Sequence, residues 1–199
     1  MNGFSRQHVV AVPALIGWCP FNETARGRRE DTYAVIRAAT KAIDPVRPMI
    51  DTSGYVHTKH TDIYDVHDYT QSPSELAEHL APLASGGEKL PFTNPANSEQ
   101  YDFRIPYFVS ECGGINWDLD EDTPAWGYGQ APKTKEEYLE RFKGLMDAML
   151  DCPYLFGFCY TQLTDVFQEK NGVYAFDRRE KFPAASLKAV ISRPAAIEQ

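Results

Sequence analysis

Two apolar runs in this chain each end in a single glutamate. Residues 10–18 are almost entirely apolar and lead to Glu23, and residues 107–109 lead to Glu111. Runs of this kind are typical of strands that are buried on both faces, as in a parallel sheet. A carboxylate at the end of a buried strand is costly to desolvate unless it has partners or a function. We therefore expect both glutamates at the carboxyl ends of parallel strands, where a barrel carries its catalytic groups.

Helical and strand patterns alternate along the rest of the chain. Helix starts are predicted at Ser72-Pro73, and at Thr134, which forms a capping box with Glu137. The predicted strands are residues 10–18, 48–51, 63–69, 107–111 and 155–161, and the predicted helices are residues 32–43, a segment from 73, a segment behind 134, and 184–191. This order predicts an α/β fold with a parallel sheet and crossover helices.

The number of predicted strands is too small for a complete barrel. An eight-stranded (β/α)8 TIM barrel needs about 250 residues, whereas this chain has 199. We expect a single domain over residues 1–199 that forms a partial TIM barrel, with a tail over 193–199. An open sheet is the alternative, and the two carboxylates at strand ends favour the partial barrel.

Composition excludes some partners. The net charge of −8 argues against nucleic acid or an anionic membrane as the main partner. No apolar run approaches the roughly 18 residues of a membrane helix. Residues 1–6 lack the apolar core of a signal peptide, so we expect a cytoplasmic protein.

The four cysteines point away from a metal centre. They form no Cys-x-x-Cys pair, so a zinc or thioredoxin-type site is not indicated, and we expect no metal and no cofactor. Buried free thiols are the simplest interpretation of Cys19, Cys112 and Cys159, which lie in or beside predicted strands. A catalytic thiol at Cys112 is an alternative for which no base is evident.

Three stretches of the sequence are informative together: Trp18-x-x-Phe21-Asn22-Glu23, Ser110-Glu111-Cys112-Gly113-Gly114 and Tyr160-Thr161-Gln162-Leu163-Thr164-Asp165. In this order they resemble glycoside hydrolase family 2, which includes β-galactosidases, β-glucuronidases and β-mannosidases. Asp51-Thr52-Ser53-Gly54-Tyr55 and Asp65-Val66-His67-Asp68-Tyr69 also fit the barrel of that family. The resemblance extends from about Val12 to Ile191. The chain departs from the family at Phe21, where the family has glycine, and at Tyr160, where some members have tryptophan.

The resemblance implies a retaining β-glycosidase. Glu23 would be the acid/base and Glu111 the nucleophile, with carboxyl groups about 5 to 5.5 Å apart. Asn22 would bind the sugar 2-hydroxyl and Tyr69 would contact the nucleophile, with His67 on the same strand face. The five strands would be strands four to eight of the barrel, so strands one to three and the domains that normally precede them would be absent.

Aromatic side chains are candidates for sugar contacts. Trp117, Trp126 and Tyr160 could each offer a ring face to the substrate. The two tryptophans could equally pack the long loop onto the sheet, and His67 could be a hydrogen-bonded core histidine.

Two other functions remain open at this point. His57, His60 and His67, with aspartates nearby, could serve a metal-dependent hydrolase. The chain could also be a non-catalytic fragment or sugar-binding module of glycosidase ancestry. A partial barrel has open sheet edges, so we expect low activity or none from the chain alone. The expected partners are a β-glycoside and either a second copy or missing N-terminal domains that complete the barrel.

Overall fold

The computed structural model describes residues 14–24, 30–94, 101–120 and 125–199. Three strands form a parallel sheet in the order β1-β2-β3. They are β1 (Tyr64–Asp68), β2 (Tyr107–Gly113) and β3 (Leu155–Thr161). The strand predicted at 155–161 is confirmed at both ends.

The two predicted N-terminal strands are present only as isolated bridges. Trp18 pairs with Met49 and Asn22 pairs with Ser53, both in parallel. The Asp62 N–H donates to the Met49 carbonyl at 2.8 Å, so the segment 49–53 lies beside the chain that enters β1. The start of the first predicted strand, residues 10–13, lies outside the described residues. The sheet therefore continues toward the N-terminus as paired but irregular segments.

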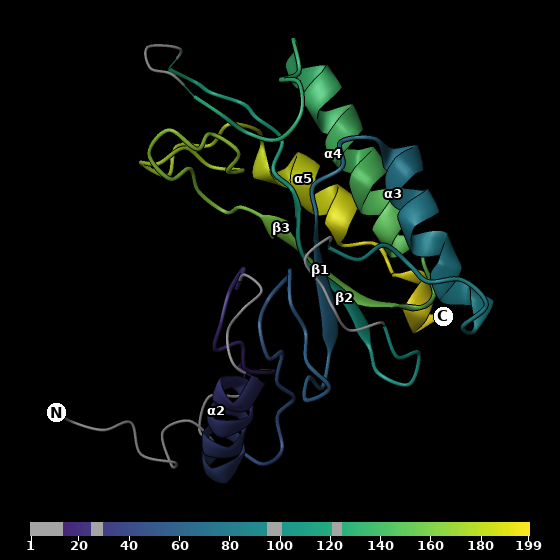
Figure 1. Ribbon diagram of the computed structural model, residues 1–199. Coiled ribbons are helices and arrows are strands. Elements are labelled where there is room, and N and C mark those ends of the chain that lie inside the picture. Colours follow the sequence, from purple (N-terminus) through teal and green to yellow (C-terminus); the bar gives the residue numbers. More distant parts are fainter. Residues whose placement is uncertain (1–13, 25–29, 95–100, 121–124) are drawn as a thin grey trace, which may run out of the picture.

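Within the described ranges, four α-helices accompany these strands. They are α2 (Glu30–Ile43), α3 (Pro73–Leu80), α4 (Lys135–Leu150) and α5 (Ala184–Ile191), with 3-10 turns η1 (Ala81–Ser85) and η2 (Ala196–Glu198). Helices α3, α4 and α5 lie together on one face of the sheet, and α2 lies apart from them near residues 14–24 (Figure 1). The rings of Phe21 and Tyr33, 5.4 Å apart, join α2 to that segment.

Both predicted helix starts are confirmed. The Ser72 hydroxyl accepts the Glu75 N–H at 3.3 Å, and Pro73 occupies the first position of α3. The Thr134 hydroxyl accepts the Glu137 N–H at 3.1 Å. The Glu137 carboxylate accepts from the Lys133 N–H at 2.7 Å, so it satisfies the donor one residue before the cap.

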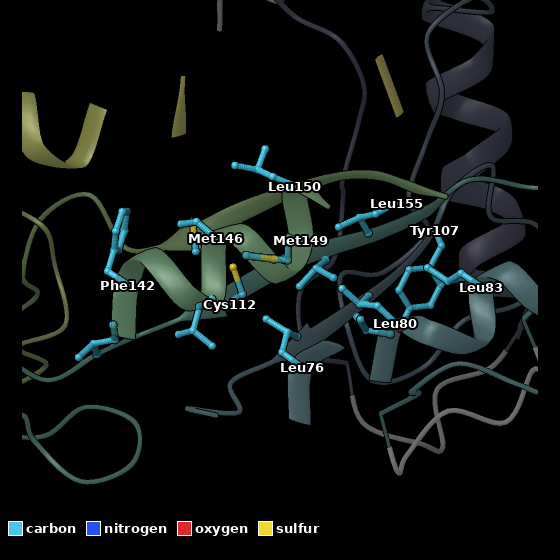
Figure 2. Packing of buried hydrophobic residues seen from close by; sticks show 14 of the residues in the cluster. Leu76, Leu80, Leu83, Tyr107, Cys112, Phe142, Met146, Met149, Leu150 and Leu155 are labelled. Atoms are coloured by element: carbon cyan, nitrogen blue, oxygen red, sulfur yellow. The ribbon is translucent and has the colours of Figure 1, made fainter. Parts of the chain in front are cut away.

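The hydrophobic core fills the space between the sheet and α3–α5. Figure 2 shows leucines of α3, methionines and Phe142 of α4, and Tyr107 and Cys112 of β2 packed together. Val66 and Val109, at equivalent positions in β1 and β2, are both 0% exposed. Because strand side chains alternate between faces, the residues next to each valine along its own strand point to the opposite face of the sheet.

A one-residue bulge in β2 shapes the face of the sheet opposite α3–α5, which we call the open face. The register pairs Val66 with Val109 and His67 with Glu111, so Ser110 is an extra residue. Regular alternation would direct Ser110 to the open face and Glu111 toward the helices. The bulge places both on the open face, beside His67.

The amino end of the open face is an apolar hollow of about 210 Å³. It is lined by Ile16, Gly17, Trp18, Cys19, Pro48, Ile50, Ile63, Phe108 and Phe156. The Phe156 side chain remains 46% exposed. The expectation of buried thiols is confirmed at Cys112 but is wrong at Cys19 and Cys159, which are free and exposed. Cys19 lines the hollow, and Cys159 lies next to a core-facing residue of β3 and so points to the open face. Helices α3–α5 therefore cover neither thiol.

The C-terminal residues pack on the helix layer. Arg193 pairs with Asp147 at the end of α4 and with Asp151 just beyond it, at 3.1 and 2.7 Å. Within the described part of the chain, no helix is both long and apolar enough to cross a membrane.

Truncation of Leu145 should measure how much the helix–sheet core contributes to stability. Leu145 is 1% exposed in the centre of the core. Leu145→Ala is expected to lower the unfolding free energy by about 2–5 kcal/mol, because it removes buried methyl groups and leaves a cavity. Urea denaturation checks this. Glu140→Ala, on the exposed side of the same helix, should change stability by no more than about 0.5 kcal/mol; equal losses in both variants would contradict this description of the core.

Candidate active site

Glu23 is held at the carboxyl end of the first segment by backbone pairing. Its N–H donates to the Ser53 carbonyl at 2.8 Å, and the Ser53 N–H donates to the Phe21 carbonyl at 2.8 Å. Its φ is +44°, a left-handed conformation that non-glycine residues seldom adopt. Such a conformation costs about 1–3 kcal/mol and is found most often at functional sites. The Glu23 side chain is 42% exposed, so it reaches into solvent at the rim of the sheet.

His67 joins the two glutamates. Its ring Nδ1 lies 2.9 Å from Oε1 of Glu23 and 3.5 Å from Oε2 of Glu111. Its backbone is fixed by Asn94, whose side chain accepts the His67 N–H at 3.0 Å and donates to the His67 carbonyl at 2.9 Å. Gly54, at φ +63°, lies so close that an added Cβ would approach the imidazole to 2.8 Å. The ring is therefore held in one orientation.

Glu111 receives a second partner from the end of β1. The Tyr69 hydroxyl donates a hydrogen bond to Oε2 of Glu111. Burial and this hydrogen bond raise the pKa of Tyr69 well above its ordinary value, so the phenol stays protonated and remains a donor. One side-chain atom each from Glu23, His67 and Glu111, a carboxylate oxygen or a ring nitrogen, lies within 4.8 Å of the other two. The side chains of the two glutamates therefore meet at one place on the rim of the sheet.

A row of aromatic rings extends from Tyr69. The Tyr128 ring stacks on it with centroids 3.6 Å apart and planes 4° from parallel. The Trp126 ring meets Tyr128 edge to face at 5.9 Å and is 44% exposed. Trp126 pairs with Glu169, so residues 125–130 lie beside the loop that follows β3, as Figure 1 also shows.

A buried ion network lies beneath the site. His57 Nδ1 is 2.7 Å from Asp51 Oδ1, and its Nε2 is 2.7 Å from the Asp65 carbonyl and 3.1 Å from Asp65 Oδ1. All three side chains are fully buried. Burial opposes the charged ring, but the hydrogen bonds to Asp51 and Asp65 outweigh it and raise the pKa of His57 to about 10. The ring is therefore an imidazolium at neutral pH that balances two carboxylates.

The structure brings only some of the predicted site residues together. Glu23, His67, Tyr69 and Glu111 form one cluster, and Asn22 lies next to it with an exposed side chain. Trp126 borders the cluster through Tyr128.

Tyr160, a predicted contact for the sugar, lies on the helix side of the sheet, away from the carboxylate cluster. Its hydroxyl lies 3.0 Å from that of Tyr138 in α4 and accepts the Ile115 N–H at 3.3 Å. Tyr160 is paired with Cys112, whose side chain points into the helix-side core. Because paired residues of parallel strands share a face, the tyrosine is directed to the same side.

Trp117 also packs away from the carboxylates. Its ring lies 5.7 Å from that of Phe182 and 6.2 Å from that of Tyr138, against the core. These contacts match the alternative in which this tryptophan packs the long loop. Cys112 is unsuited to catalysis, because burial raises the pKa of its thiol and its Sγ faces the Cys159 carbonyl at 3.3 Å.

Several residues that form the site are not predicted by the sequence pattern. Ser53 and Gly54 fall in a stretch that resembles the family, but nothing in the pattern shows that they contact His67. Tyr128 lies in an irregular loop without any periodic signal. Among the described residues, the donor group compact enough to hold a metal ion is Glu23, His67 and Glu111; His57 and His60 do not belong to it.

Comparison with known proteins connects this fold to glycoside hydrolases. No protein-family model and no curated protein matches the chain. Among solved structures, the GH2 β-galacturonidase of Eisenbergiella tayi bound to galacturonate has a TM-score of 0.62 at 16% identity, over 92% of this chain and 34% of that one. The β-glucuronidase of Lactobacillus rhamnosus has a TM-score of 0.62 at 18% identity, over 96% and 34%. An agarase has a TM-score of 0.53 at 17% identity, over 82% and 22%.

The chain thus spans about a third or less of the length of these structures. At such identities the likeness shows a shared fold. The chain has an α/β fold similar to part of the fold of these glycoside hydrolase structures.

The buried imidazolium predicts a pH dependence of stability. The folded pKa of His57 lies above its ordinary 6.5, so its contribution is complete below about pH 6.5 and is lost as the pH rises toward 10. The difference in unfolding free energy between wild type and His57→Gln should shrink over this range, by at most about 1.4 kcal/mol per pH unit. Urea denaturation at a series of pH values measures it. An NMR titration that finds the wild-type His57 ring neutral near pH 7 would contradict the charge assignment.

Proposed function

We propose that this chain carries the catalytic pair of a retaining β-glycosidase of the family 2 type. The observation that supports this most directly is the approach of Glu23 and Glu111, from segments far apart in the sequence, to within 4.8 Å around His67. Each carboxylate lies at the carboxyl end of its strand or strand-like segment, on the open face of the sheet. The shared fold with glycoside hydrolases supports the same reaction class.

In this mechanism Glu111 attacks the anomeric carbon and forms a covalent glycosyl-enzyme. Glu23 donates its proton to the leaving oxygen, then takes a proton from the water that releases the sugar. The hydrogen bond from Tyr69 orients the nucleophile. Asn22 would bind the 2-hydroxyl, and the exposed ring of Trp126 would contact the sugar or aglycone.

The five parallel segments correspond in this proposal to strands four to eight of a TIM barrel. The apolar hollow at the amino end of the open face would then be barrel interior that lacks its other wall. Preceding domains or a second copy would supply that wall. The sugar is left open, since the similar structures carry the names of uronidases and of an agarase.

Covalent labelling tests the catalytic pair even if turnover is weak. We expect an activated 2-deoxy-2-fluoro β-glycoside, drawn from a galactoside, glucuronide, glucoside and mannoside panel, to add one sugar to the chain at Glu111. Intact mass and peptide mapping measure this. Glu111→Gln should abolish labelling, and Glu23→Gln should retain most of it, because an activated leaving group needs no acid. A chelator should have no effect.

Other outcomes of that experiment have distinct meanings. Labelling at another residue, or equal labelling of Glu111→Gln, would contradict the nucleophile assignment. Sugar binding without labelling would favour a non-catalytic module. Loss of labelling with a chelator would favour metal-dependent chemistry at Glu23, His67 and Glu111.

The open apolar face predicts self-association of the isolated chain and little hydrolysis of aryl β-glycosides. Phe156→Lys should shift the sedimenting species toward monomer, because it places a charge in the hollow. Val46→Lys is the matched control, since Val46 is 86% exposed and does not line the hollow. A wild-type chain that stays monomeric at all concentrations and hydrolyses these substrates rapidly would refute the partial-barrel proposal.

A further inference from the structure

The side chain of Ser53 lies between a buried carboxylate and the ring of His67. Its Oγ is 2.9 Å from Asp65 Oδ2 and 2.9 Å from His67 Nε2. Ser53, Asp65 and His67 are 7%, 0% and 5% exposed, so bulk water does not compete for these contacts. The three residues come from two parts of the chain, because Ser53 belongs to the segment beside β1 and the other two belong to β1 itself.

The direction of the hydrogen bonds around Ser53 follows from its single proton. A serine hydroxyl donates once and its oxygen can also accept. Three acceptors lie within reach: Asp65 Oδ2, His67 Nε2, and Ser110 Oγ at 3.1 Å. Hydrogen bonds to a carboxylate are about twice as strong as those between neutral groups. Ser53 therefore donates to Asp65, and its lone pairs face His67.

The surroundings of Asp65 keep its carboxylate a fixed acceptor. The Gly54 N–H donates to Oδ2 at 2.9 Å, and the Ser110 hydroxyl donates to the same oxygen. Oδ1 lies 3.1 Å from the His57 ring, which carries a positive charge. Removal of one member of such a buried network would leave a charge without a partner.

We propose that Ser53 and Asp65 are positioning residues that fix the His67 ring with its proton on Nε2 and the lone pair of Nδ1 toward Glu23. Nε2–H then donates to Ser53 Oγ, and the bare Nδ1 lies 2.9 Å from Oε1 of Glu23 and 3.5 Å from Oε2 of Glu111. That oxygen of Glu111 accepts instead from Tyr69. A bare ring nitrogen accepts a hydrogen bond from the acid form of Glu23 and offers no donor to its carboxylate form. Gly54, packed on the face of the ring, fixes the plane of the imidazole.

The consequence for catalysis rests on the proposed function. When Glu23 is the acid, the ring holds its proton-bearing oxygen in a defined place before the proton passes to the leaving group. The proton that Glu23 later removes from water restores the same hydrogen bond. The tautomer of His67 is set by its contact with Ser53, which in turn is fixed by Asp65.

The tautomer can be measured without any turnover. The chain labelled with ¹⁵N-histidine is examined by NMR near neutral pH, and His67→Gln identifies the ring signals of His67 by their loss. We expect a protonated Nε2 and an unprotonated Nδ1 in the wild type. An imidazolium, or a proton on Nδ1, would overturn the proposal, and this measurement needs no variant of Ser53 to be stable.

Two serine variants separate positioning from general packing. Ser53→Ala should convert the His67 signals to a mixture of tautomers, because the acceptor for Nε2–H is gone. Ser110→Ala is the matched control, since Ser110 donates to Asp65 but makes no hydrogen bond to the imidazole. The control should leave the His67 tautomer unchanged. Unchanged tautomers in Ser53→Ala, or equal changes in both variants, would overturn the proposal.

Kinetics then connect the tautomer to the acid/base step. In a preparation that hydrolyses β-glycosides, Ser53→Ala should lower kcat about tenfold with little change in KM, a part of the 10²–10⁴ that acid–base catalysis contributes. The loss should be larger for substrates with poor leaving groups, which need the acid. An altered tautomer with equal losses for all leaving groups would overturn the link to Glu23. Absence of hydrolysis in every preparation would count against the proposed function but would leave the NMR result standing.

Discussion

The buried carboxylate of Asp65 is the interaction on which the site depends. It joins three parts of the chain, because Ser53 and Gly54 of the N-terminal segment, His57 of the following loop and Ser110 of β2 all contact it. An uncompensated charge at 0% exposure would cost several kcal/mol. The partners that offset this cost also determine how the irregular N-terminal segments lie against the regular sheet. Glu23 reaches His67 only because those segments are held there.

The bulge at Ser110 adds a second constraint. A strand with strict alternation can present either Ser110 or Glu111 to the open face, whereas this site uses both. The extra residue lets the serine contact Asp65 while the glutamate lies beside His67 and Tyr69. Bulges next to active sites commonly redirect one side chain in this way. A hydrophobic pattern alone cannot reveal such a bulge, because the apolar positions of β2 end before it.

The elements with strong local signals were predictable from the sequence. The caps at Ser72 and Thr134 fixed two helix starts, and β3 and α5 were predicted at their observed bounds. The site was harder to predict from the sequence, because its contacts are formed between distant segments. Tyr160 shows the difficulty: a strand position beside a motif says little about which face the ring takes. Tyr128 had no periodic neighbours to mark it, yet it stacks directly on Tyr69.

Different interactions dominate the two ends of the open face: apolar contacts at the amino end and hydrogen bonds at the carboxyl end. At the amino end the apolar hollow has no polar groups to fix a partner in one register, and burial would supply the driving force for whatever covers it. At the carboxyl end the hydrogen bonds of Asp65, His67 and Glu111 are directional and are formed within the chain. The orientation of the two glutamates therefore does not depend on anything that covers the hollow. Under the proposed function, a further wall would add enclosure of the sugar and exclusion of water, so the geometry of the pair and its catalytic power would be separable properties.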